Sequence, residues 1–189
     1  MIELVLGLLI FVVTHSLRVT APQWRERQLL NFGPLGYKVA VSLLSLVSLW
    51  FIVQGYGAAR LDPVVMWQPA LATRHIAALL MLVSMVLLVA AYAPANAIRA
   101  KLKHPMVLAV KVWAVAHLLA NGTLADWLLF GTLLVWAVFN FRAARRRDIE
   151  FGPSSGLATT VTVVVGVALW AGLVWRWHAW LFGVSPLGM

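Results

Sequence analysis

Six long apolar runs constrain this chain more than any other feature of its sequence. A helix needs about 20 mostly apolar residues to cross a bilayer. The runs cover residues 2–19, 37–56, 73–93, 105–120, 124–141 and 157–181, of which the fourth is short. Hydrophobic residues make up 62% of the chain, whereas soluble domains contain about 45–50%. The sequence therefore predicts an all-α, polytopic membrane helix bundle of about six transmembrane helices, with residues 1–189 forming a single integral membrane domain.

The segments between the runs carry different signals. Residues 18–36 mix arginines with large apolar side chains, which is typical of a short basic amphipathic helix on a membrane surface. We expect that helix to end at the Asn-Phe-Gly-Pro sequence of residues 31–34. The connection at residues 62–69 is predicted to be extended, and Asn121-Gly122 is predicted to form a tight turn.

The 15 Lys and Arg residues are unevenly distributed between alternate connections. Eleven lie in the first, third and fifth connections, three lie on the opposite side, and Lys111 lies inside the fourth run. Because cytoplasmic loops of membrane proteins are enriched in Lys and Arg, both termini are predicted to be periplasmic. The net charge of +9 is then explained by orientation in the membrane, so we expect the lipid bilayer, and not nucleic acid, as the partner.

The chain contains no cysteine. This excludes disulfides, zinc–thiolate sites, iron–sulfur clusters and covalent attachment of c-type haem. Ligands for a metal must therefore come from the five His, the six Asp and Glu, or Met. Ionisable side chains inside membrane spans are costly and mark candidate functional sites, which makes the histidines the first residues to consider.

His15 lies near the inner end of the first run. Arg18 follows at i+3, so both side chains project from one face of a helix. In one interpretation, His15 bonds to a neighbouring backbone carbonyl and Arg18 extends to the lipid headgroups. In the other, His15 is a ligand to a cofactor and Arg18 holds an anionic substituent of it.

The fourth run is the most polar. His104 and His117 are 13 residues apart, which in a helix is about 19.5 Å of rise and about 220° of rotation. One metal ion cannot take both from a straight helix. Lys111 shares the face of His104, whereas Trp113 and Asn121 share the face of His117. We expect the first face to bind or position an anionic group, such as a haem propionate or a phosphate headgroup.

His178 belongs to a tryptophan-rich segment, residues 175–180. Such a segment is typical of an aromatic belt at the membrane interface, so an interfacial role for His178 is the structural alternative to ligation. Depth in the predicted topology pairs His117 with His178, or His15 with His104. Haem held between two imidazoles on different helices needs no cysteine.

Three segments carry a resemblance to a known family: THSLR at residues 14–18, KHP at residues 103–105 and AHLLANG at residues 116–122. Together with the ending from His178 to Pro186, they resemble the NnrU family of bacterial membrane proteins, in order and over essentially the whole chain. That family is related to plant 15-cis-zeta-carotene isomerase and, more distantly, to isoprenylcysteine carboxyl methyltransferases. The resemblance implies a place in the bacterial inner (cytoplasmic) membrane and an association with denitrification.

The resemblance also implies a cofactor. The plant isomerase binds haem b in the membrane, and two of its histidines have the same spacing as His104 and His117. The second of these, with a histidine in a His-Ser motif of the first span, is implicated in axial ligation, which implies His117 and His15 here. The residues expected to bind the cofactor are Arg18, His104, Lys111, Trp113 and Asn121, and the expected metal ligands are His117, His15 and His178.

These expectations describe a haem b-binding membrane protein with a redox, sensory or isomerase-like role in nitrogen-oxide metabolism and a hydrophobic small molecule as its candidate substrate. One alternative is a haem-free methyltransferase-like enzyme, although residues 103–105 lack the Arg of that motif and residues 147–152 only faintly echo its acidic patch. The other is an assembly or accessory protein for denitrification. Thr123 stands where family members often have an acid, and Asp126 follows three residues later.

Overall fold

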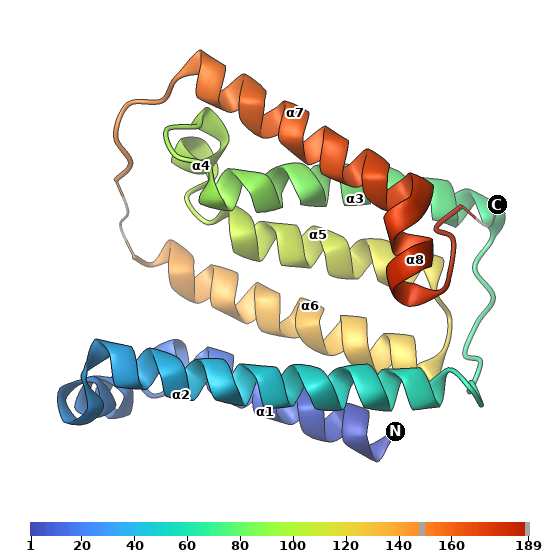
Figure 1. Ribbon diagram of the computed structural model, residues 1–189, viewed down its shortest axis with the longest axis horizontal. Coiled ribbons are helices and arrows are strands. Elements are labelled where there is room, and N and C mark those ends of the chain that lie inside the picture. The colour runs from blue at the N-terminus through green and yellow to red at the C-terminus, as the bar shows by residue number, and fades with distance from the viewer. Residues whose placement is uncertain (148–149, 188–189) are drawn as a thin grey trace. The chain divides into compact units, whose positions relative to one another are not determined.

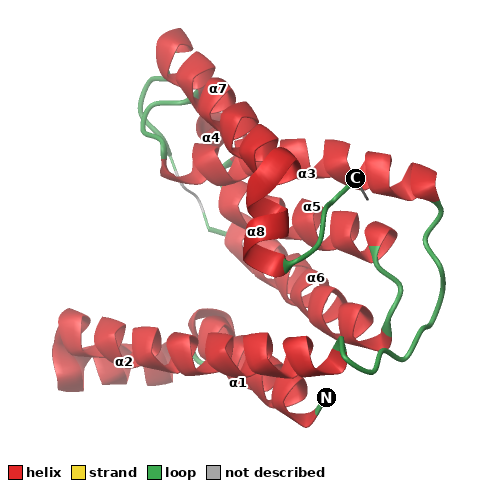
Figure 2. Cartoon of the chain, turned by 45° about the vertical axis from the view of Figure 1, so that its right-hand side comes forward, coloured by secondary structure: helices red, strands yellow, loops and turns green. Residues whose placement is uncertain are grey.

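The computed structural model describes residues 1–147 and 150–187, and most of them are helical (Figures 1 and 2). The helices are α1 (Ile2–Thr20), α2 (Pro22–Ala59), α3 (Leu71–Tyr92), α4 (Ala97–Leu102), α5 (Pro105–Ala120), α6 (Leu124–Arg145), α7 (Gly156–Gly172), the π-helix η1 (Leu173–Trp177) and α8 (His178–Phe182). Within these described residues, five stretches are long and apolar enough to cross a membrane, namely α1, α2, α3, α6 and Gly156–Phe182, and α5 is a shorter apolar helix. The predicted all-α membrane helix bundle is confirmed.

The helix α2 joins the predicted amphipathic segment to the second span. At Gly33 the backbone has φ 70° and ψ 167°, which is not helical. Glycine adopts such a positive φ at little steric cost, and Pro34 then suits a new first turn. The break therefore falls within the predicted Asn-Phe-Gly-Pro sequence. On the segment before it, Leu30 is 86% and Phe32 67% exposed, which suits contact with lipid.

The first of two compact units contains Met1–Met66 and Thr123–Trp136. In this unit α1 and α2 are antiparallel and pack closely through small residues, as membrane helices commonly do. A Cβ atom added at Gly7 would lie 2.7 Å from the Ile52 backbone nitrogen, and one at Gly55 would meet the Leu4 backbone. Ser48 is fully buried between the two helices and donates to the Gly7 carbonyl at 2.9 Å.

The second unit contains Trp67–Gly122 and the chain from Ala137 onward. Here α3 runs antiparallel to α5 and α7 (Figure 1). Ser84 Oγ donates to the Ala109 carbonyl at 2.9 Å between α3 and α5, and Trp170 Nε1 donates to the Ala78 carbonyl at 2.8 Å between α7 and α3. The two units are described separately, and the single domain over residues 1–189 stays a prediction.

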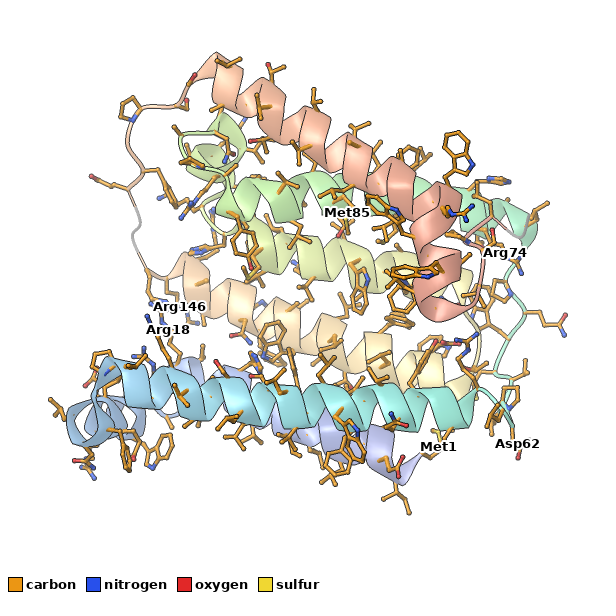
Figure 3. All side chains as sticks on the ribbon, viewed as in Figure 1. Met1, Arg18, Asp62, Arg74, Met85 and Arg146 are labelled. Atoms are coloured by element: carbon orange, nitrogen blue, oxygen red, sulfur yellow. The ribbon has the colours of Figure 1, made fainter. Side chains whose placement is uncertain are left out.

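Most cations of the second unit lie at one of its ends. Figure 3 shows Arg146 at this end and Arg74 at the opposite end. The first end is formed by α4, the start of α5 and the end of α6, where His104 contacts Phe141. Its cations are Arg99, Lys101, Lys103, Arg142, Arg145, Arg146 and Arg147. We call this region the basic end of the second unit.

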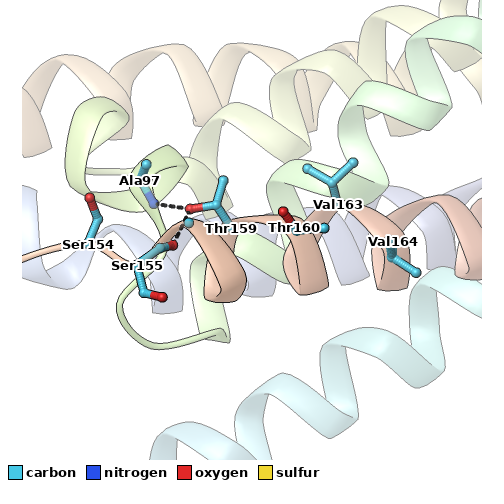
Figure 4. A pocket seen from close by; sticks show the side chains of 8 residues that line it. Ala97, Ser154, Ser155, Thr159, Thr160, Val163 and Val164 are labelled. Carbon is cyan, nitrogen blue, oxygen red and sulfur yellow. Dashed lines mark hydrogen bonds between the residues drawn. The ribbon is translucent and has the colours of Figure 1, made fainter.

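The short helix α4 was not predicted from the sequence. Asn96 caps it by accepting a hydrogen bond from the Arg99 backbone nitrogen at 2.7 Å. The Ala97 nitrogen donates to Thr159 Oγ1 at 2.9 Å, and Thr159 Oγ1 donates to the Ser155 carbonyl at 2.9 Å. Ala97, Ser155 and Thr159 line a hollow at the N-terminal end of α7 (Figure 4). The Thr159 hydroxyl is thus engaged by backbone groups that attach α4 to α7.

Candidate functional site

His117 lies in the last turn of α5, and its ring is held by its own helix. Its Nδ1 lies 2.9 Å from the Trp113 carbonyl oxygen, four residues earlier. Because a carbonyl only accepts, Nδ1 must carry a proton. The two rings also contact each other, with centroids 4.9 Å apart. Asn121 caps the helix by donating both its backbone N–H and its Nδ2–H to the His117 carbonyl, each at 2.9 Å.

A loop tryptophan fixes this cap from outside the helix. Trp67 Nε1 donates to the Asn121 carbonyl at 3.1 Å, and the Trp67 backbone nitrogen donates to the Gly122 carbonyl at 3.1 Å. A Cβ on Gly122 would collide with the Trp67 backbone. The prediction of a tight turn here is wrong, because Asn121 is extended (φ −128°, ψ 145°) and the segment pairs with the Trp67 loop. Trp67 was not predicted from the sequence to contribute to this site.

His15 repeats the arrangement on α1 in the first unit. Its Nδ1 lies 3.0 Å from the Phe11 carbonyl oxygen, and the His15 ring stacks on the Phe11 ring with centroids 4.1 Å apart and an interplanar angle of 19°. Ser45 Oγ lies 3.5 Å from His15 Nε2, but its proton goes to the Val41 carbonyl at 2.7 Å. Neither group therefore has a proton for this contact while the ring is neutral, and the Nε2 lone pair faces an oxygen.

His178 follows the π-helix and begins α8. Its Nδ1 lies 2.8 Å from the Val184 carbonyl oxygen, which a left-handed Gly183 (φ 71°) brings back toward the helix. Phe182 packs against the imidazole with ring centroids 4.9 Å apart. The helix α8 lies at the same end of the second unit as the C-terminal end of α5 (Figure 1).

The three predicted metal ligands thus share one protonation pattern. Each donates Nδ1–H to a backbone carbonyl, the usual arrangement of a histidine that ligates a metal through Nε2. This chemistry fits axial ligation of haem. His15 belongs to the first unit, whereas His117 and His178 belong to the second. Among residues 1–147 and 150–187, no group of three or more His, Asp or Glu could hold a metal ion, so a site built only from protein ligands gains no support.

The predicted anion-binding face of α5 lies at the basic end. The His104 ring meets Phe141 of α6 edge-on, with centroids 6.5 Å apart at 89°, and Lys111 Nζ lies 4.7 Å from the centroid of the same ring. The prediction that His104 and Lys111 share a face is therefore confirmed. Nε2 of His104 is buried, and no hydrogen-bond partner for it exists among the described residues.

The surroundings of His104 favour its neutral form. Burial lowers the pKa of the imidazole below its usual value. A backbone contact with Ala144 acts in the opposite direction. Arg147, Arg145 and Lys103 add positive charge nearby and lower the pKa further.

The remaining residues considered in the sequence are either exposed at the surface or stabilise a helix end. Arg18 lies in the last turn of α1 and is exposed. Asp126 is only 4% exposed and accepts from the Thr123 nitrogen at 2.8 Å, which caps α6 as in a capping box. It also accepts from the Tyr56 hydroxyl at 2.5 Å. Residues 147–152 resemble the acidic patch of the methyltransferases only faintly, and Asp148 in this segment lies outside the described residues.

Comparison with known proteins identifies the family of nearly the whole chain. Searches of curated proteins and of solved structures found no match. A family model described as NnrU protein matches residues 3–186, which include all three histidine segments and the C-terminal ending quoted above. Because this match covers nearly the whole chain, the protein belongs to the NnrU family.

Proposed function

We propose that this protein binds haem b non-covalently within the membrane and uses His117 as one axial ligand. The observation that carries the proposal is the hydrogen bond from His117 Nδ1 to the Trp113 carbonyl, which leaves Nε2 as the ligating nitrogen. The cap by Asn121 and the contact of Trp67 with that cap orient the last turn of α5.

Two histidines are candidates for the opposite axial position. His15 is the residue that the family resemblance implies, and it has the same i−4 aromatic partner and the same tautomer as His117. His178 shares the second unit with His117 and also presents Nε2. Variants of both histidines therefore belong in one experiment.

Haem held by two imidazoles supplies one-electron chemistry and an iron whose ligation responds to small molecules. We therefore propose a redox or sensory role linked to nitrogen-oxide metabolism, in the bacterial inner membrane with both termini periplasmic. An isomerase-like reaction on a hydrophobic small molecule is the enzymatic form of the same proposal.

The test is the absorption spectrum of the full chain purified in detergent. The wild type should show a Soret band, and His117→Ala should lose or shift it. One of His15→Ala and His178→Ala should do the same, which identifies the second ligand. His75→Ala is the matched control, because His75 is exposed on α3 and outside the proposed site. Folding of each variant is checked by size-exclusion chromatography, and His117→Gln serves if the alanine variant does not fold. A wild-type spectrum in a folded His117 variant would show that the assignment is wrong.

A further inference from the structure

The basic end of the second unit contains a buried polar atom for which the described residues provide no partner. Nε2 of His104 is buried without a hydrogen-bond partner among the described residues. Unsatisfied buried polar atoms are rare in native structures and call for an explanation such as a bound group. Among the described residues, the charged side chains that shift the pKa of His104 are Arg147, Arg145 and Lys103, all cationic. A bound group that accepts a hydrogen bond from Nε2 would therefore interact most favourably with these cations if it were an anion.

The charge balance of the second unit also favours an anionic ligand. Its sequence contains ten Lys and Arg but only two acidic residues. Seven of the cations lie at the basic end, and Lys111 adds an eighth from within α5, where the Phe141 ring contacts its ammonium group. The aromatic ring attracts a cation through its electron-rich face but cannot neutralise it. The only acidic residues in the sequence of this unit, Asp148 and Glu150, are outnumbered by these cations, so an anion from outside the chain would be attracted to this end.

The geometry separates this site from the proposed haem ligand. His104 and His117 are 13 residues apart on one helix, which corresponds to about 19.5 Å along the axis. His104 therefore lies at the opposite end of α5 from His117. Basic pockets between transmembrane helices commonly bind phosphate headgroups of anionic lipids, and the helices of this unit are apolar enough to lie in a bilayer.

We propose that the basic end of the second unit, with His104 at its centre, binds the phosphate of an anionic phospholipid headgroup. His104 Nε2–H donates to a phosphate oxygen, and Lys103, Arg145 and Arg147 supply the surrounding positive charge. This proposal does not depend on haem. The phosphate could also come from solution, and the experiment below separates the two sources.

Binding of the anion is coupled to a proton. Without the anion, burial and nearby cations lower the pKa of His104 and so favour its neutral form. A bound phosphate favours the imidazolium, so the pKa of His104 is higher in the complex than in the free protein. Affinity must then increase as the pH falls through the range between these two pKa values, by up to about tenfold for each unit of difference.

The experiment measures lipid retention on the purified full chain by native mass spectrometry. The probes are phosphatidylglycerol and phosphatidylcholine with the same acyl chains, at about pH 6 and about pH 8. The wild type should prefer phosphatidylglycerol, and the preference should be roughly three- to tenfold larger at the lower pH. His104→Ala should reduce the preference and remove its pH dependence. His104→Gln retains a donor but cannot take up a proton, so it should keep part of the preference without the pH dependence.

Two controls make the result specific. His75→Ala and Arg176→Gln change exposed groups at the opposite end of the same unit, and both should behave as the wild type. Equal preference at both pH values in the wild type, or an unchanged preference in His104→Ala, would overturn the proposal. If inorganic phosphate at millimolar concentration abolishes the preference for phosphatidylglycerol, the ligand comes from solution and the lipid assignment is wrong. If phosphate has no such effect, the lipid assignment is supported.

Discussion

Replacing Gly122 by Ala tests the contact that holds the end of α5. The added Cβ would collide with the Trp67 backbone, so the loop must move away from residues 121–122. Two hydrogen bonds would then be lost, Trp67 N–H to the Gly122 carbonyl and Trp67 Nε1–H to the Asn121 carbonyl, each 3.1 Å long. A typical intramolecular hydrogen bond contributes about 0.5–1.5 kcal/mol. We therefore expect a destabilisation of about 2 kcal/mol.

The assay is thermal unfolding of the full chain in detergent, followed by size-exclusion chromatography after heating. For a chain of this size, about 2 kcal/mol corresponds to a midpoint about 6 °C lower. Gly131→Ala is the matched control, since nothing lies within 4 Å of its added Cβ in α6. Alanine is the better helix former there by about 0.5–1 kcal/mol, so this variant should unfold at an equal or slightly higher temperature.

The two substitutions are expected to change the unfolding midpoint in opposite directions, and this difference is the test. If Gly122→Ala unfolds within about 1 °C of the wild type, Trp67 does not hold the end of α5, and the account of how His117 is oriented fails with it. If Gly131→Ala is destabilised as strongly as Gly122→Ala, the effect belongs to any added methyl group and says nothing of the loop.

Two further predictions concern packing and topology. Ser48→Ala removes the buried hydrogen bond to the Gly7 carbonyl and should destabilise the chain by about 1–2 kcal/mol, whereas Ser42→Ala, at an exposed position of α2, should leave the unfolding midpoint unchanged. A reporter that is active only in the cytoplasm should give signal when fused after Arg147 and none when fused after Met189; the reverse pattern would show that the orientation is inverted.

The six apolar runs were sufficient to predict the long apolar helices, but not α4, because membrane spans depend on local composition. The fourth run was predicted at residues 105–120, which are the bounds of α5 in the structure. Pro105 and Asn121 are strong local signals for its two ends. The shared faces of α5 could likewise be predicted, because helical periodicity alone determines them.

What the sequence could not predict depends on contacts between distant segments. Trp67 and Asn121 are 54 residues apart, and their hydrogen bond leaves no local pattern. The same holds for the burial of His104 Nε2, which depends on α6 as well as on α5. One local signal was overlooked: an aromatic residue stands four positions before both His15 and His117. In a helix this spacing places its ring against the imidazole.

The shortness of α5 has a consequence for the bilayer around the protein. Its 16 residues span about 24 Å, whereas the hydrocarbon core is about 30 Å thick. If α5 crosses the bilayer, the non-helical backbone at its ends lies at a depth where water is scarce, and such backbone is tolerated only when other protein groups satisfy it. Trp67 does this for Asn121 and Gly122.

A hydrophobic mismatch of about 6 Å costs fractions of a kcal/mol per ångström, and membranes accommodate it by thinning locally. A bilayer crossed by α5 would therefore present a narrower barrier around this helix than around the longer ones. His104 and His117, at the two ends of α5, would then bring polar groups closer to each other across the membrane than the ends of a longer helix could.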